Sequence, residues 1–289
     1  IDEELAGVIA QMSPWQADTA VSRFNRAPAG TRVRLPNDLY YVLNVAREIA
    51  AASEGACDAT RGELVDLWGF GPPISWRDPG FSPPEAAAID AALARSGWQR
   101  LDLDARDGSA FQPGGLRLDL SAIAKGHAVD RVARRLTAEG IADHLVDIGG
   151  ELRGTGIKAD GQPWWVALET PPDRDGRALV AGIETVVALC ALSVATSGDY
   201  RRWYEHGGQR HAHTIDPRTG HPLANDLAAV TVLHRDCLRA DAWSTALMVR
   251  GADAGLVLAE AHHLAARFVR RRADGLVEVT SRAWQAMLE

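Results

Sequence analysis

The sequence predicts an α+β protein, in which helices and strands follow one another along a single chain. The chain has 289 residues, enough for one large domain or for two intimately packed ones. Its composition, 46% hydrophobic and 24% charged, is that of a globular protein and excludes a disordered or fibrous chain. Segments with helical periodicity alternate with short apolar runs, and the linkers between them are brief.

Amphipathic periodicity and capping signals predict the helices. Residues 38–53 have apolar side chains at helical spacing, and Gly55 follows as a stop signal. Ser82-Pro83-Pro84-Glu85 has the form of a capping box and opens an alanine-rich helix that ends at Ser96-Gly97. Further helices are expected over residues 122–139, closed by Gly140, and over 241–249 and 252–262.

Short apolar runs predict the strands, and clusters of Pro, Gly and Asp predict the linkers between them. The expected strands cover residues 116–120, 145–148, 164–169, 186–194 and 228–233, with a final hairpin over 266–269 and 276–280. The expected linkers are residues 69–84 and 170–176.

Charge, hydropathy and cysteine content exclude several classes of protein. The net charge is 31 − 38 = −7, so nothing indicates a nucleic-acid-binding surface. No apolar run reaches the ~20 residues that a membrane-spanning helix needs. Cys57, Cys190 and Cys237 form no metal-type pair and cannot all be bridged within the chain, which leaves the redox compartment open. The first residue is Ile1, so we expect any secretory signal or lipid anchor to lie upstream.

The first segment that suggests chemistry covers residues 119–126 and contains Lys125. The only other lysine of the chain is Lys158. It ends a strand-like run and opens a helix, whose free N–H groups and dipole favour a phosphate group. A lysine in the first turn opposes the dipole unless an anion is bound there. Gly126 permits close packing or close approach of a ligand. A surface lysine on an ordinary helix is the alternative interpretation, and both stay open.

The second segment is a helix that carries Asp241 and Thr245 at positions i and i+4. Their side-chain oxygens therefore face the same way. A carboxylate and a hydroxyl are hard oxygen ligands that suit Mg²⁺ when other oxygens complete the coordination. In the alternative interpretation Asp241 caps the helix and Thr245 bonds back to its own turn.

The third segment places His211 and His213 at alternate positions of an expected strand, just before an Asp-Pro-x-x-Gly turn at residues 216–220. The two histidines could bind zinc, but no third His or Cys ligand has a convincing spacing. A histidine beside a turn is usually structural or exposed. If the segment is extended, His213 and Ile215 share one face.

Taken in order, the motifs of this chain resemble the FAD:protein FMN transferase family, the ApbE-type flavin transferases. Eight motifs carry the resemblance, in the family's order and approximate spacing. They are Ser22-Arg23-Phe24-Asn25, Gly55-Ala56-Cys57-Asp58-Ala59-Thr60, Leu67-Trp68-Gly69-Phe70-Gly71, residues 119–130, Val146-Asp147-Ile148-Gly149-Gly150-Glu151, Ala195-Thr196-Ser197-Gly198-Asp199-Tyr200, residues 213–220 and residues 241–245.

The resemblance implies a Mg²⁺-dependent transferase that moves the FMN half of FAD onto a threonine or serine hydroxyl of an acceptor flavoprotein. The new bond is a phosphoester, and AMP is released. Two alternatives stay open: a Mg²⁺-dependent FAD pyrophosphatase that gives FMN and AMP, and a flavin-binding protein without activity. The family also implies an acceptor such as a subunit of a membrane redox complex, and an extracytoplasmic location, either periplasmic or anchored to the membrane.

The resemblance also implies roles for single residues. His213 is the general base, and Lys125 supplies a positive charge beside the pyrophosphate. Cys57 stands where the family commonly has an aromatic or other apolar residue, and we expect a small buried side chain there. The implied metal ligands are Asp241, Thr245 and the carbonyl of Ala122. The implied FAD-binding residues are Trp15, Ala56, Cys57, Asp58, Asp119, Lys125 and Ile215.

The implied fold is ApbE-like (T-fold-like), with two interwoven α/β subdomains and the FAD cleft between them, in a single domain of residues 1–289. The first strand of the family has no match in this sequence. We therefore expect that strand upstream of Ile1, and residues 1–12 as the end of the first helix.

Overall fold

The structure is a computed structural model that describes residues 1–172, 185–273 and 275–287. The chain divides into two compact units, each built from separate stretches of sequence. Unit 1 comprises Ile1, Lys125–Arg201 and Asn225–Glu289, and unit 2 comprises Asp2–Ala124 and Arg202–Ala224. Along the sequence, segments of one unit alternate with segments of the other, which confirms the expectation of two interwoven subdomains.

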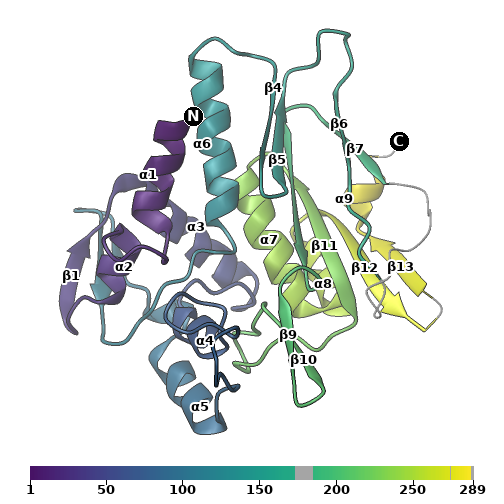
Figure 1. Cartoon of the computed structure of the whole chain (residues 1–289). Helices are drawn as coiled ribbons and strands as arrows, with labels where there is room; N and C mark the ends of the chain where they lie inside the picture. Colours follow the sequence, from purple (N-terminus) through teal and green to yellow (C-terminus); the bar gives the residue numbers. More distant parts are fainter. Residues whose placement is uncertain (173–184, 274, 288–289) are drawn as a thin grey trace. The chain divides into compact units, whose positions relative to one another are not determined.

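Unit 1 is built on a six-stranded sheet in which every pair of neighbouring strands is antiparallel, in the order β13-β12-β11-β8-β5-β4 (Figure 1). Antiparallel pairing is what distinguishes α+β from parallel α/β proteins. The central strand β11 is buried along almost its whole length, in keeping with its continuous apolar sequence. The strands are β4 (His144–Ile148), β5 (Glu151–Thr155), β8 (Leu192–Gly198), β11 (Leu227–His234), β12 (Ala265–Arg272) and β13 (Gly275–Thr280).

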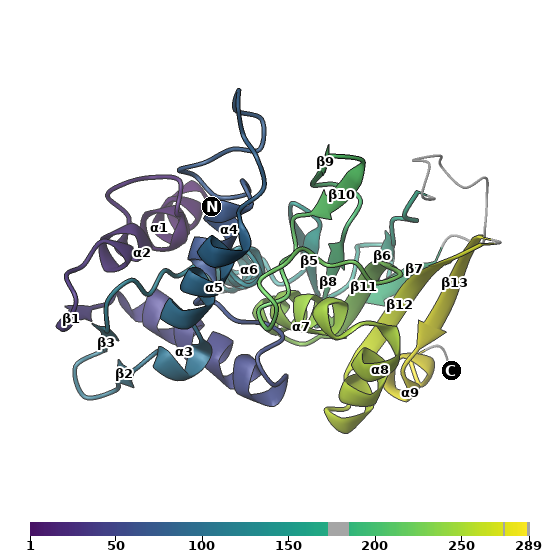
Figure 2. The same cartoon turned by 90° about the horizontal axis from the view of Figure 1, so that it is seen from below.

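Helices cover one side of this sheet (Figure 2). Helix α7 (Cys237–Arg250) packs on β8 and β11, and α8 (Ala252–Ala261) and α9 (Arg282–Gln285) pack on β12. Helix α6 (Ala124–Ala138) leads into unit 1. The strands β6 (Trp164–Ala167) and β7 (Val186–Leu189) form a separate antiparallel hairpin.

Unit 2 combines helices with two small antiparallel sheets. The sheets are β1-β3-β2 and the hairpin β9-β10. Its apolar core includes Leu64, Trp68, Phe70, Tyr204 and Ile215, so the last stretch of the unit packs against its middle. The elements are α1 (Asp2–Met12), α2 (Ala20–Asn25), β1 (Thr31–Arg34), α3 (Asn37–Ala52), α4 (Gly62–Leu67), α5 (Ala86–Arg95), the 3₁₀ helix η1 (Trp98–Arg100), β2 (Leu103–Asp104), β3 (Ser109–Gln112), β9 (Trp203–His206) and β10 (Gln209–Ala212).

Most of the predicted elements are confirmed, with the following exceptions. The range 186–194 is not one strand, because Ala191 takes a left-handed conformation (φ 53°) between β7 and β8. Residues 116–120 form only a single bridge, from Arg117 to Arg61. Glu85, and not Ser82, is the N-cap of α5, so the expected capping box does not form. Part of the expected linker 170–176 lies outside the described residues.

Within the described residues, no helix is both long enough and apolar enough to cross a membrane.

Candidate functional site

Gly126 allows the start of α6 and the start of α7 to meet within unit 1. A Cβ at this position would lie 2.6 Å from the carbonyl carbon of Cys237 and 2.7 Å from the backbone nitrogen of Leu238, which no real side chain tolerates. The Gly126 N–H donates to Asp241 Oδ2 at 3.0 Å. The neighbouring Lys125 is thereby fixed beside the helix that carries Asp241, so two predicted site residues come together.

A carboxylate from α6 caps α7. Asp130 accepts hydrogen bonds from the backbone N–H groups of Cys237 at 3.1 Å and Leu238 at 3.0 Å, and it receives Arg153 Nη1 at 2.6 Å. Capping by a residue far away in the sequence explains why α7 begins four residues before the predicted start at Asp241. Asp241 is therefore inside the helix, and the interpretation of Asp241 as its cap is wrong.

Thr245 is bonded to the sheet. Its Oγ1 lies 2.9 Å from Ser197 Oγ on β8, and the same Ser197 hydroxyl lies 2.8 Å from Ser244 Oγ. The side chain that bonds back within the helix is Ser244, which donates to the Asp241 carbonyl at 2.9 Å. Asp241 and Thr245 thus keep the i, i+4 arrangement on α7 that the sequence predicts.

Glu151 lies beside Lys125, although the sequence analysis did not predict it as a site residue. It is the first residue of β5, and its side chain is 3% exposed. Its Oε1 forms an ion pair with Lys125 Nζ, whose side chain is 47% exposed. Lys125 is therefore neither buried nor a solitary surface lysine, because its ammonium lies against a buried carboxylate.

The electrostatics of the group are dominated by burial. Burial raises the pKa of Asp241 to about 7, the negative charge of Glu151 adds to the rise, and Lys125 and the Gly126 N–H oppose it. Burial likewise raises the pKa of Glu151, and Lys125 opposes it. Of these two buried carboxylates, Glu151 is the one in contact with the ammonium of Lys125. Within the described residues no three His, Cys, Asp or Glu side chains cluster in a way that could hold a metal, so a cation here would also need hydroxyl, carbonyl or ligand oxygens.

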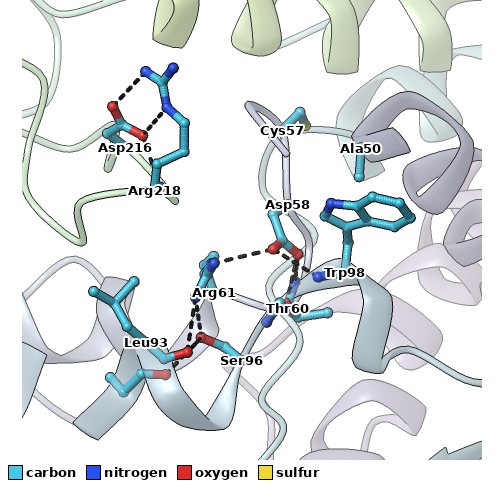
Figure 3. Close-up of polar contacts among 12 residues, drawn as sticks. Ala50, Cys57, Asp58, Thr60, Arg61, Leu93, Ser96, Trp98, Asp216 and Arg218 are labelled. Atoms are coloured by element: carbon cyan, nitrogen blue, oxygen red, sulfur yellow. Dashed lines mark hydrogen bonds and ion pairs between the residues drawn. The ribbon is translucent and has the colours of Figure 1, made fainter. Parts of the chain in front are cut away.

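In unit 2, Asp58 organises its own loop (Figure 3). Its carboxylate accepts the N–H and hydroxyl of Thr60 at 2.9 and 2.7 Å and the N–H of Trp98 at 3.0 Å, and it lies 3.3 Å from Arg61 Nε. These contacts engage both oxygens of Asp58 within the unit. This carboxylate therefore links the expected FAD-binding loop to Thr60, Arg61 and Trp98.

The other residues expected at this loop lie beside it or inside the core. The Asp119 N–H donates to the Ala59 carbonyl at 2.9 Å, and Asp119 Oδ1 accepts the N–H of Ser121 at 2.9 Å. Ala56 and Cys57 are buried, as expected for Cys57, whereas Trp15 is 61% exposed. Ala122 lies in the turn directly before α6.

His213 follows β10 and lies in a bend, so it is not part of a continuous strand with Ile215. Its Nδ1 lies 3.1 Å from the carbonyl oxygen of Arg202, and its backbone N–H donates to the same oxygen at 3.1 Å. Because a carbonyl oxygen only accepts, Nδ1 carries the proton, and the lone pair of the neutral ring is on Nε2. The Phe70 ring meets the imidazole edge-on, with centroids 6.2 Å apart.

His211 is in a different environment from His213. It is buried, with ring centroids 5.3 Å from Trp68 and 5.0 Å from Tyr204, and burial lowers its pKa. Ile215 is also buried in this aromatic cluster, where the indole N–H of Trp68 donates to the Gly220 carbonyl at 2.8 Å. The predicted turn at residues 216–220 forms as expected. Asp216 at its first position pairs with Arg218 at 2.7 Å (Figure 3).

The predicted site residues thus fall into two groups, one in each unit. Unit 1 contains Lys125, Asp241 and Thr245, which the structure brings together. The sequence reading missed Glu151, Asp130 and Ser197 there, although all three lie inside the eight motifs. Unit 2 contains Trp15, Ala56, Cys57, Asp58, Asp119, Ala122, His213 and Ile215.

Comparison with known proteins gives consistent relatives over the whole chain. A chain from Vibrio cholerae named FAD:protein FMN transferase is 37% identical over 288 residues, which cover 100% of this chain and 83% of the relative. A Haemophilus influenzae protein of the same name is 37% identical over 297 residues, covering 100% and 82%.

Solved structures agree with these relatives. The apo form of the Pseudomonas stutzeri flavinyl transferase ApbE is 40% identical with a TM-score of 0.87, covering 99% of this chain and 86% of that one. The flavin transferase ApbE from Vibrio cholerae is 35% identical with a TM-score of 0.88, covering 99% and 88%. The family model described as "ApbE family" matches residues 1–268. With the predicted α+β fold and the expected motifs in place, the chain belongs to the ApbE family.

Proposed function

We propose that this protein is an FAD:protein FMN transferase. The observation that carries the proposal is the similarity, over the full chain, to relatives of that name at 37% identity. The grouping of Lys125, Asp241 and Thr245 in unit 1 supports it, because phosphoryl transfer depends on positioned charges more than on covalent chemistry of the protein.

The proposed reaction joins an acceptor hydroxyl to the FMN-side phosphorus of FAD. The acceptor oxygen forms a new P–O bond, the P–O bond of the pyrophosphate breaks, and AMP leaves with its phosphate. The proton of the acceptor threonine or serine goes to a base. We propose that this base is His213 Nε2, because the Arg202 carbonyl fixes the proton on Nδ1. His211 is less suited, since it is buried between Trp68 and Tyr204.

We propose Mg²⁺ as the cofactor, held by Asp241 Oδ, Thr245 Oγ1 and the Ala122 carbonyl. The donor set is entirely oxygen, as Mg²⁺ prefers, and Asp241 and Thr245 lie at i and i+4 on the same helix. When bound, the ion would neutralise charge on the pyrophosphate oxygens. Lys125, which follows Ala124 at the start of α6, would add a second positive charge.

We further propose that FAD binds to the predicted residues of unit 2 together with Lys125. Exposed Trp15 offers an aromatic surface to the isoalloxazine ring, and the carboxylate of Asp58 holds the loop 56–58 so that its backbone can contact the ligand. Side-chain contacts from Ala56 and Cys57 would be few, since both are buried. Asp119 lies beside the loop. Ile215 would contribute through the aromatic cluster.

The acceptor is proposed to be a flavoprotein with a threonine or serine flavinylation site, such as a subunit of a membrane redox complex. An extracytoplasmic location is proposed with it. The family resemblance supports both statements.

Mass spectrometry after incubation with FAD, Mg²⁺ and a candidate acceptor tests the function. Transfer predicts that the acceptor gains the mass of FMN less one water and that AMP appears. Free FMN and AMP without a change in the acceptor would indicate a pyrophosphatase, and intact FAD would indicate a binding protein. Asp241→Ala is the control, because it removes the charged oxygen ligand and should abolish transfer. Turnover equal to that of the wild type in Asp241→Ala would refute the proposed cation site.

A further inference from the structure

Glu151 has no role in the function proposed so far, although its position is unusual for a carboxylate. The residue is 2% exposed, and only its Oε1 is paired, with Lys125 Nζ. Its Oε2 is also buried and finds no hydrogen-bond partner among the residues that the structure describes. A buried polar oxygen without a partner is costly, so such an oxygen calls for a ligand.

The local backbone is built to hold this carboxylate in place. Gly149 and Gly150 connect β4 to β5 with φ values of 69° and 98°, a left-handed pair that side chains disfavour. Asp147 Oδ1 accepts the Gly150 N–H at 2.9 Å and closes the turn. Glu151 follows immediately, paired with Ile148 in the register of the hairpin. The tight turn therefore fixes the backbone at Glu151, whose side chain contacts Lys125.

A second buried carboxylate lies in the same electrostatic environment. Asp241 is 4% exposed, and its charge interacts with the charges of both Glu151 and Lys125. The Gly126 N–H satisfies Asp241 Oδ2. Lys125 is a single positive charge whose ammonium already contacts Glu151 Oε1. Lys125 and Gly126 are neighbours in the chain, and the first contacts Glu151 Oε1 while the second donates to Asp241 Oδ2, so both carboxylates are bonded to the same two-residue stretch. Carboxylate oxygens are the ligands that hard divalent cations prefer.

We propose that Glu151, through Oε2, is a second carboxylate ligand of the cation site, and that Glu151 and Asp241 together bind a divalent cation in the absence of FAD. This inference rests on the proposed function, because it concerns the cation of the transfer reaction. It assigns Glu151 a part in metal binding beyond its ion pair with Lys125.

Titration of the full chain with Mn²⁺ alone tests the inference, with free Mn²⁺ followed by electron paramagnetic resonance. We expect saturable binding by the wild type without FAD. Glu151→Gln removes the charge but keeps the size of the side chain, and it should weaken Mn²⁺ binding at least tenfold. Asp241→Asn should have a similar effect. Glu151→Asp keeps the charge but withdraws the oxygens by one methylene, so it should also weaken binding.

Asp147→Asn is the matched control. It removes one negative charge from the same hairpin, while the amide oxygen can still accept the Gly150 N–H. This variant should change Mn²⁺ affinity less than threefold, and thermal unfolding should show that all variants are folded. Mn²⁺ affinity equal to that of the wild type in both Glu151→Gln and Glu151→Asp would overturn the inference. An equal loss in Asp147→Asn and Glu151→Gln, or a wild type without saturable binding, would also overturn it.

The failure of this inference is distinguishable from a failure of the proposed function. FMN transfer to an acceptor by the wild type, measured by mass spectrometry, together with unchanged Mn²⁺ affinity in Glu151→Gln, would reject only the role of Glu151. Saturable Mn²⁺ binding that depends on Glu151, without FMN transfer to the acceptor, would support the cation site and reject the transferase.

Discussion

Replacing Gly126 by alanine is expected to destabilise the protein, although alanine favours helices. Gly126 lies in α6, and its new Cβ would lie 2.6 Å from the carbonyl carbon of Cys237 and 2.7 Å from the nitrogen of Leu238. It would also meet the Cys237 carbonyl oxygen. All of these are backbone atoms of α7, which cannot rotate away as a side chain could. Helices α6 and α7 would therefore have to separate.

The size of the effect follows from two costs and one gain. Inserting a methyl group into a well-packed contact costs about 1–3 kcal/mol. Separation of the helices also weakens the hydrogen bond from the Gly126 N–H to the Asp241 carboxylate, and bonds to charged groups contribute about 1.5–3 kcal/mol. Alanine recovers about 1 kcal/mol through its helix propensity. We therefore expect a net loss of about 1.5–5 kcal/mol in the free energy of unfolding.

Urea unfolding followed by tryptophan fluorescence measures this loss as a lower midpoint with an unchanged slope. Gly7→Ala in α1 is the control, because its Cβ would meet no atom within 4 Å. This variant should gain about 0.5–1 kcal/mol. A Gly126→Ala protein with a midpoint equal to or above that of the wild type would refute the argument that Gly126 is required for contact between the helices.

Three further predictions concern the proposed base, the lysine and a buried carboxylate. His213→Ala should slow FMN transfer by about 10²–10⁴-fold with little change in FAD affinity, and the acidic limb of the pH–rate profile should disappear; a retained limb would assign the proton to another group. Lys125→Arg keeps the charge but not the compact ammonium beside Glu151, so turnover should stay below that of the wild type. If Lys125→Arg and Lys125→Ala both match the wild type in kinetics and FAD binding, the interpretation as a surface lysine is correct. Burial raises the pKa of Asp66 to about 6, against the opposing charge of Arg117. The folded protein then holds this proton more tightly than the unfolded chain, so the free energy of unfolding should fall by up to about 3 kcal/mol as the pH rises from about 4 to about 6. In Asp66→Asn, the free energy of unfolding measured with urea should depend less on pH between about 4 and about 6. A pH dependence equal to that of the wild type would contradict this prediction.

Local patterns were sufficient for helices whose signals lie within their own sequence. The predicted helix over residues 38–53 matches α3, because its apolar positions form one buried face and a left-handed Gly55 follows. The start of α7 was mispredicted for the opposite reason. Its capping group is Asp130, which lies 107 residues from Cys237 in the sequence, so no local pattern could indicate it.

The strand prediction over residues 186–194 failed because hydrophobicity does not specify which partner a strand pairs with. The continuous apolar run forms two strands with different partners: β7 pairs with β6, and β8 pairs with β5 and β11. The change of partner occurs at Ala191, a residue type that rarely adopts positive φ. Periodicity therefore gave no sign of the break.

Part of the candidate site was predictable from the sequence, but the pairing of Lys125 with Glu151 was not. Spacing on a helix was enough to place Asp241 and Thr245 on one face, because that relation is local. Glu151 belongs to β5, and only the fold reveals that its carboxylate pairs with Lys125 of α6. The glycines around it were the available signal. Gly126 is the clearer signal, because a Cβ on this helical glycine would meet the backbone at the start of α7, so the glycine marks a close contact between the two helices. In this chain the Gly149-Gly150 turn directly precedes Glu151 and Gly126 directly follows Lys125, so both glycine motifs lie beside the residues of this ion pair.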